Sequence, residues 1–206
     1  KKGFRKPGQT GTGLARRRSR GQAAFTRSNR PRRSRIVPRH TGPMVDEGDR
    51  APDFELPGLR GSERGVYRLS DCVTHGGVLL AFYPCDFSPL CKEKLCTLRD
   101  VEWFEFQPEF SVLGISQDSL YAHEEFIGRH DIPFPLLSDT DGRVTRSYDV
   151  QYDYWQRQPG LPRRAFFVLD ESRTVRYRAV ATEATEVPDL GPLLDAVRSL
   201  SAPKSD

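Results

Sequence analysis

Cys91 is the residue in this sequence that is best placed to act as a nucleophile. It follows Ser88 and Pro89, a strong helix start, because serine is favoured at the N-cap and proline at the first helical position. Cys91 is therefore expected to be the third helical residue. The free backbone N–H groups and the positive end of the helix dipole favour a thiolate there. The spacing thus predicts a reactive cysteine.

The residues before this helix are expected to form a buried strand and a tight loop. Val78 to Tyr83 are six consecutive apolar residues, too few for a free helix and typical of a strand that is covered on both faces. Pro84 ends the strand because it has no N–H to donate to the sheet. The stretch is thus predicted to be a buried strand, a tight loop and the start of a helix that carries Cys91 in its first turn.

This stretch resembles the active-site signature of the peroxiredoxins, in which a proline and then Thr or Ser precede the peroxidatic cysteine. Cys96, five residues after Cys91, resembles the resolving cysteine of the bacterioferritin-comigratory (Q-type) branch. The likeness covers roughly Met44 to Leu200. The stretches that carry it are Phe82–Pro84, Asp86–Pro89, the opening Gly48–Phe54, the core strand Leu113–Ser116 and the arginine-bearing strand Arg164–Asp170.

The resemblance implies a thioredoxin-dependent thiol peroxidase that reduces hydrogen peroxide and organic hydroperoxides without a metal or organic cofactor. The Cys91 thiolate would attack the peroxide and become a sulfenic acid. Cys96 would condense with it to a Cys91–Cys96 disulfide, which a thioredoxin-like protein reduces by exchange. By the same resemblance, Ser88 and Arg164 stabilise charge on the departing oxygen and Pro84 shields the site from water.

The resolving role of Cys96 raises a geometric problem. Five residues along a helix advance about 7.5 Å and turn about 500°, so the two side chains would point about 140° apart. Their Cα atoms would be more than about 8 Å apart, beyond the reach of a disulfide. Resolution by Cys96 therefore requires the first turns to unwind in every cycle. The alternative is a one-cysteine peroxidase, or a peroxide sensor that passes oxidation to a partner protein.

Arg163 and Arg164 are adjacent, at the start of a strand expected over 165–169. Successive side chains of a strand point to opposite faces, so only one of the two can face the cysteine. The resemblance selects Arg164.

The remaining cysteines suggest no second site. Cys85 stands where the family commonly has a polar residue, and Lys94 where it often has Glu or Gln. Cys85 is either a spare thiol that traps the sulfenic acid or simply a small residue at a strand end, and we favour the latter. Cys72 has no motif around it. Together with His75, the cysteines lack the close pairs of a structural zinc site, and the Cys-x-x-Cys of a disulfide reductase is absent.

The distribution of charge divides the chain into a basic tail and an acidic domain. Residues 1–45 carry 14 Lys and Arg and no Asp or Glu, whereas residues 46–206 carry 18 Lys and Arg against 28 Asp and Glu. The tail lacks apolar periodicity and is predicted to be disordered. We expect a native start at Met44, the only methionine, with residues 1–43 as an upstream mis-extension. The alternative is that the tail is an arm that binds nucleic acid. We favour the first interpretation and therefore expect no nucleic-acid partner.

The domain at 46–206 is expected to be an α/β domain of the thioredoxin type, a central mixed sheet flanked by helices. No apolar run approaches the roughly 18 residues of a membrane span. Four cysteines are too few for a disulfide scaffold, so a cytoplasmic enzyme is expected, as a monomer or weak dimer. Strands are expected at 53–56, 67–69, 78–83, 112–115, 165–169 and 175–180, a turn at 57–61, and helices at 89–106, 119–130, 144–148 and 187–200.

Overall fold

The computed structural model describes residues 44–73, 76–101, 110–183 and 185–201. The chain divides into two units, residues 1–36 and 37–206, and every described residue belongs to the second. Residues 1–43 of the basic tail therefore lie outside the described residues, as does His75, and Met44, the proposed native start, is the first described residue. None of the helices that the structure describes is both long and apolar enough to cross a membrane.

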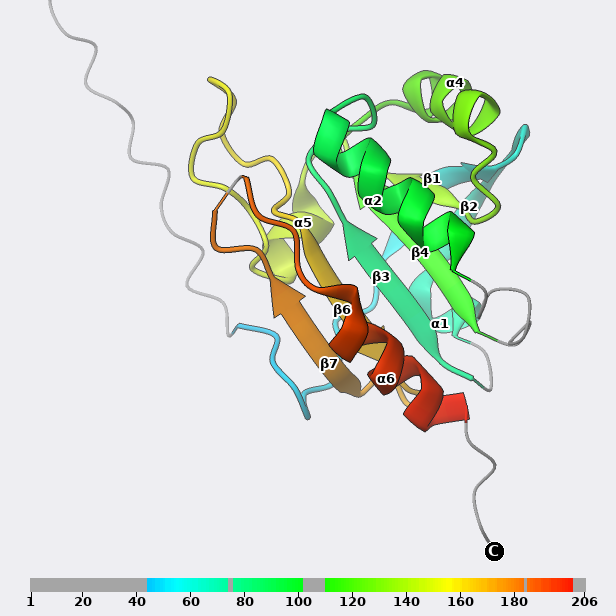
Figure 1. Cartoon of the computed structure of the whole chain (residues 1–206), viewed down its shortest axis with the longest axis vertical. Coiled ribbons are helices and arrows are strands. Elements are labelled where there is room, and N and C mark those ends of the chain that lie inside the picture. Colours follow the sequence, from blue (N-terminus) through cyan, green and yellow to red (C-terminus); the bar gives the residue numbers. More distant parts are fainter. Residues whose placement is uncertain (1–43, 74–75, 102–109, 184, 202–206) are drawn as a thin grey trace, which may run out of the picture. The chain divides into compact units, whose positions relative to one another are not determined.

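A mixed sheet of seven strands forms the centre of the described region, in the order β2-β1-β5-β4-β3-β6-β7 (Figure 1). Strands β3, β4 and β5 run parallel to one another, and the pairs β1–β2, β1–β5, β3–β6 and β6–β7 are antiparallel. The α/β architecture with a mixed sheet is thus confirmed. The strands are β1 (Glu55–Arg60), β2 (Glu63–Arg68), β3 (Val78–Phe82), β4 (Ser111–Ser116), β5 (Leu136–Ser138), β6 (Ala165–Leu169) and β7 (Val175–Val180).

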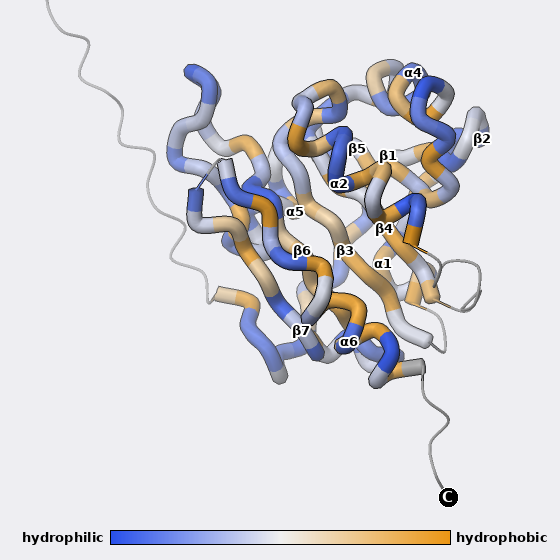
Figure 2. Tube along the Cα trace, viewed as in Figure 1, coloured by the Kyte–Doolittle hydropathy of each residue, from blue (hydrophilic) through white to orange (hydrophobic). Residues whose placement is uncertain are grey.

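The helices cover both faces of this sheet. The alternation of β3 divides its side chains, with Leu79 and Ala81 in one apolar cluster and the other three residues in a second. The first cluster includes residues of α2 (Pro89–Asp100), α4 (Leu120–His130) and α6 (Leu190–Ser201); the second includes residues of α1 (Leu69–Cys72) and α5 (Arg143–Ser147). Figure 2 shows the apolar stretch of β3 at the centre of the fold.

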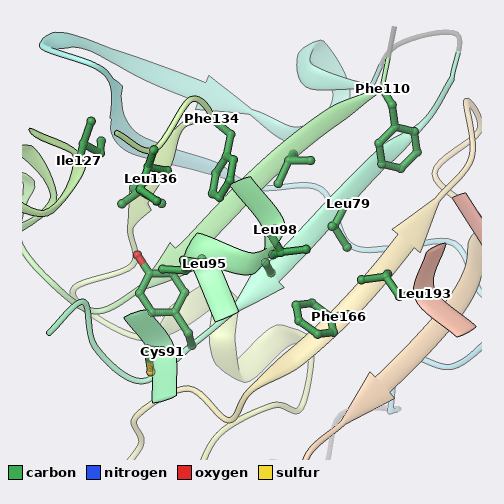
Figure 3. Packing of buried hydrophobic residues seen from close by; sticks show 14 of the residues in the cluster. Leu79, Cys91, Leu95, Leu98, Phe110, Ile127, Phe134, Leu136, Phe166 and Leu193 are labelled. Carbon is green, nitrogen blue, oxygen red and sulfur yellow. The ribbon is translucent and has the colours of Figure 1, made fainter. Parts of the chain in front are cut away.

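Helix α2 lies across the sheet with its apolar side against β3 and β6. In Figure 3, Cys91, Leu95 and Leu98 follow one another along this buried side, close to Leu79 and Phe166. All three α2 residues are at most 2% exposed. The spacing of three and four residues places them on one helix face, so the packing that anchors the helix also buries Cys91.

The first hairpin corrects the sequence interpretation. Pro57, Gly58 and Leu59, expected in a turn, lie inside β1, and the turn comes at residues 61–62. Gly58 is needed for close approach rather than for a turn, because a Cβ there would lie 2.3 Å from Leu137 Cδ2 and 2.8 Å from the Leu136 carbonyl oxygen. Glycine in a strand often marks such an approach of another backbone.

Gly58→Ala is therefore expected to lower the free energy of unfolding by about 2 kcal/mol or more, since a backbone oxygen must move to admit the methyl group. The matched control is Gly65→Ala, at the position paired with Gly58 in β2, where the nearest atom to an added Cβ is 3.7 Å away. We expect the control to change stability by less than about 0.5 kcal/mol. Urea denaturation measures both; equal effects would contradict the steric explanation.

Three further elements differ from expectation. Helix α2 ends at Asp100 and Val101 is extended, whereas a helix was expected to 106; residues 102–109 lie outside the described part. Helix α6 begins at Leu190 rather than at 187, and Pro188 disfavours a helical conformation of Val187, the residue before it. Strand β5 was missed: it has three residues, too few for a visible alternation, but it pairs with both β4 and β1.

Candidate active site

The structure brings two of the predicted site residues, Cys91 and Ser88, to the guanidinium group of a third, Arg164. Cys91 is the third residue of α2, and its Sγ lies 3.6 Å from Arg164 Nη2. The same nitrogen is 3.5 Å from Ser88 Oγ. Cys91 and Arg164 are only 1% and 3% exposed, so the sulfur and the cation meet in a largely water-free setting. Charge on the sulfur, or on an oxygen beside it, would be stabilised strongly there.

Ser88 occupies the N-cap position of α2 as expected, but its side chain makes no capping hydrogen bond. The first helical bond instead runs from the Lys92 N–H to the Ser88 carbonyl, at 2.9 Å. The hydroxyl is turned to Arg164, so it is available to the site rather than to the helix.

Arg164 reaches the cysteine because of the antiparallel pairing of β6 with β3. Ala165, the next residue, lies opposite Phe82, the last residue of β3. The loop that follows, residues 83–88, leads to α2 and is called the catalytic loop. Arg163 goes elsewhere, since its Nη2 donates to the carbonyls of Ala181 and Thr182 at 2.5 and 3.0 Å. The alternation expected along the strand therefore separates the two arginines.

Pro84 is buried directly after β3, where the Tyr83 N–H makes a last sheet bond to the Ile115 carbonyl. It also lines a pocket of about 250 Å³ beside the catalytic loop. The other residues of this pocket are Cys85, Gln117, Asp118, Thr140, Trp155, Gln156, Gln158 and Leu161.

Cys96 is not brought to Cys91. Both are free thiols on the single continuous helix α2, Cys91 buried and Cys96 half-buried. Five helical residues separate them by about 7.5 Å along the axis. In this arrangement a Cys91–Cys96 disulfide can form only after α2 unwinds locally.

Comparisons with known proteins place this geometry in a family. Residues 47–178 match the profile of the AhpC/TSA family. The chain belongs to this family. It is 35% identical over 131 residues to the putative peroxiredoxin bcp of Coxiella burnetii, covering 62% of this chain and 83% of that protein. It is 30% identical over 137 residues to peroxiredoxin Bcp of Bacillus subtilis, covering 64% and 83%.

A solved structure agrees with these relatives. Peroxidoxin BcpB of Mycobacterium tuberculosis superposes with a TM-score of 0.64 at 28% identity, over 78% of this chain and 99% of that one. The resemblance to the bacterioferritin-comigratory branch, the thioredoxin-like fold and a thiol peroxidase activity are thereby confirmed.

One buried polar network at the catalytic loop was not foreseen from the sequence. The Asp86 side chain accepts hydrogen bonds from Tyr83 and His123, and its main-chain N–H donates to Asp118. Burial, and then the neighbouring Asp86 charge, raise the pKa of the Asp118 carboxyl. Asp86 belongs to the motif quoted above, but His123 shows in the sequence only as a histidine on the apolar side of a helix.

Tyr152 is a second residue that the sequence did not single out. Its hydroxyl is buried and lies beside the Arg164 guanidinium. Burial raises the pKa of this phenol, and the charge of Arg164 opposes that effect. Its ring stacks with Trp155, whose side chain lines the pocket beside Pro84.

Cys85 is half-buried in the same pocket, and its thiol is hard to ionise. Burial, and then the neighbouring Cys91, raise the pKa of Cys85 to about 11. Because the thiolate is the nucleophile in thiol chemistry, this favours the interpretation of Cys85 as a small residue over that of a sulfenic acid trap.

Alkylation of Cys85 by iodoacetamide in the folded protein is therefore expected to be slow at pH 7.5 and to rise about tenfold per pH unit until about pH 11. Raising the pH adds thiolate, so the rate can only increase over this window. Peptide mapping by mass spectrometry measures it, with the urea-unfolded chain as the control. A rate at pH 7.5 equal to that of the unfolded chain would contradict the prediction.

Proposed function

We propose that this chain is a thioredoxin-dependent peroxidase that reduces hydrogen peroxide and organic hydroperoxides through Cys91 and a Cys91–Cys96 disulfide. The observation that supports it most is the cluster of Cys91, Ser88 and Arg164 at the start of α2. A thiol that is held against a guanidinium and free backbone N–H groups suits attack on a peroxide and stabilisation of the oxygen that leaves.

The proposed cycle has three balanced steps. The Cys91 thiolate attacks the terminal oxygen of ROOH, the O–O bond breaks, and the RO⁻ that leaves takes a proton; sulfur is oxidised to the sulfenic acid. The Cys96 thiol then attacks that sulfur, an S–S bond forms and water leaves. A thioredoxin dithiol reduces the disulfide by two exchanges and is itself oxidised.

Each further site residue has a proposed part in the first step. Arg164 and the Cys91 N–H stabilise negative charge as it moves from sulfur to the departing oxygen, and the Ser88 hydroxyl orients the peroxide. Pro84 has no N–H to bind water and closes one side of the site. The burial of Cys91 and Arg164 supports a setting in which these interactions are strong.

The integrity of α2 favours a second candidate within the same chemistry. Because Cys91 and Cys96 cannot bond while the helix is intact, an external thiol can also resolve the sulfenic acid. The chain would then be a one-cysteine peroxidase, or a peroxide sensor that passes its oxidation to a partner protein.

The setting proposed for the enzyme is the cytoplasm, as a monomer or weak dimer. All four cysteines are free thiols, which reducing compartments maintain. The described region exposes five large apolar side chains, and we take this small number to favour weak rather than extensive self-association. They are Met44, Val66, Phe87, Tyr121 and Tyr154.

The test is peroxide-dependent NADPH oxidation with thioredoxin and thioredoxin reductase, together with the intact mass after one equivalent of peroxide. Continuous turnover and a loss of about two mass units, for two hydrogens, are expected. A gain of about sixteen mass units without turnover would favour the one-cysteine alternative. A protein that consumes no peroxide at all would contradict the proposed function.

A further inference from the structure

The catalytic loop carries a buried carboxylate that takes no direct part in the proposed chemistry. Asp86 lies midway between Pro84 and Ser88 and is fully buried. Its Oδ1 accepts a hydrogen bond from Tyr83 Oη at 2.8 Å, and its Oδ2 is 2.9 Å from His123 Nδ1. Both partners are buried, and His123 belongs to α4 rather than to the loop.

The direction of these bonds follows from the groups. A carboxylate only accepts, so the tyrosine hydroxyl and His123 Nδ1 donate. The other ring nitrogen of His123, Nε2, is buried and meets no hydrogen-bond partner in the part of the chain that the structure describes. The polar contact of this imidazole is therefore made through Nδ1, to Asp86.

The main chain of the loop is held at the same residue. The Asp86 N–H donates to Asp118 Oδ2 at 2.8 Å, and this oxygen also accepts from Ser116 Oγ at 2.8 Å. The next loop residue, Phe87, packs edge-on against Phe126 of α4 with ring centroids 5.5 Å apart. Helix α4 thus holds the loop at two successive residues.

Stability alone does not account for this arrangement. Burying a carboxylate is costly unless its hydrogen bonds are made, and apolar side chains of equal volume often give equal or greater stability. Here two carboxylates, Asp86 and Asp118, approach each other at the one loop that precedes Cys91. The hydrogen bonds of this network are directional, so they fix the orientation of the loop, which apolar packing does not.

We propose that His123 is a positioning residue for the reaction of Cys91, which it serves by holding Asp86 and with it the loop that carries Pro84 and Ser88. This inference rests on the proposed role of Cys91 as the peroxidatic cysteine. A misplacement of about 1 Å in a catalytic group can cost about a hundredfold in rate, so the loop needs such an anchor.

The test compares two replacements of the same histidine. His123→Asn keeps an N–H donor near the position that Nδ1 occupies in the histidine. His123→Gln places its amide near the position of Nε2, which has no hydrogen-bond partner among the described residues. The second-order rate constant for oxidation of Cys91 by hydrogen peroxide, measured in single-turnover stopped flow, is expected to fall about 10- to 100-fold in the Gln variant. In the Asn variant it is expected to stay within about threefold.

Two controls separate positioning from a general loss of structure. The midpoints of thermal unfolding of both variants are expected to fall by similar amounts, so stability does not explain the difference in rate. His130→Gln, on the last turn of α4, alters a histidine that packs on Phe126 and lies outside the network. It is expected to keep the rate constant of the unmutated protein.

Equal rate constants for the Asn and Gln variants, or a Gln variant as fast as the unmutated protein, would overturn the proposal. If the Gln variant does not fold, Tyr83→Phe provides the test, because it removes only the hydroxyl that donates to Asp86 Oδ1. This variant is expected to slow the oxidation of Cys91 about 3- to 10-fold. An unchanged rate would overturn the proposal. If Cys91 of the unmutated protein is not oxidised, it is the proposed function that fails.

Discussion

Cys91→Ser is expected to abolish peroxide consumption, whereas Cys96→Ser is expected to consume one equivalent of peroxide and then stop in the presence of thioredoxin. A serine hydroxyl does not ionise near neutral pH, so the first variant has no nucleophile at the guanidinium. The second variant keeps Cys91, Ser88 and Arg164 in place and loses only the thiol that closes the cycle. Cys96 is half-buried and is not among the buried residues of α2, so its replacement by the similar serine is expected to leave the helix intact.

The measurement is the number of peroxide equivalents consumed per protein, followed with NADPH oxidation in the coupled assay. The loss in steady-state rate is expected to exceed about a thousandfold for Cys91→Ser and about a hundredfold for Cys96→Ser. Cys72→Ser is the matched control, since Cys72 lies in α1 on the opposite face of the sheet. Full thioredoxin turnover by Cys96→Ser would refute the intramolecular disulfide while leaving Cys91 as the nucleophile.

Arg164→Met is expected to lower the rate of Cys91 oxidation by about 100- to 1000-fold. Full ionisation of a free thiol gains at most about thirtyfold at neutral pH, so most of the acceleration must come from stabilising charge on the transferred and departing oxygens. Arg164 is the cation that lies against both Sγ and the Ser88 hydroxyl. Methionine keeps much of the volume of the side chain, so the loss reports the guanidinium rather than a cavity.

Arg163→Met provides the control, because this neighbouring side chain binds the carbonyls of Ala181 and Thr182 instead. It is expected to lower stability but to leave the oxidation rate within about threefold. Stopped-flow oxidation with hydrogen peroxide measures both variants. Similar losses in the two would show that charge near the start of β6, and not the contact with Cys91, sets the rate.

The parts of the fold that the sequence allowed us to predict are those with a clear period or a clear boundary. Strand β3 is uniformly apolar and ends two residues before Pro84, and α4 is capped by Ser119, whose hydroxyl accepts the Ala122 N–H. The prediction of a turn at residues 57–61 was wrong. Glycine and proline favour turns locally, whereas Gly58 is required here by the close approach of β5. That approach depends on tertiary packing rather than on the local sequence, and β5 itself is too short to show an alternating pattern.

The same division holds at the site. Ser88 and Cys91 could be named from a short motif, and Arg164 could be named because the resemblance to the peroxiredoxins selects it from two adjacent arginines. His123 could not, because its partner Asp86 lies 37 positions away and the pairing depends on how α4 packs on the loop. A histidine among Phe126 and Ile127 looks like core filling until the carboxylate opposite it is known.

The placement of both cysteines on one continuous helix links folding to redox equilibrium. In the proposed cycle the dithiol form keeps the first turns of α2 and the disulfide form loses them, so the free energy of those turns enters the reduction potential of the pair. For a two-electron couple, about 1.4 kcal/mol of helix stability corresponds to about 30 mV. Each contact that strengthens the start of α2 therefore makes the disulfide more oxidising and easier for thioredoxin to reduce.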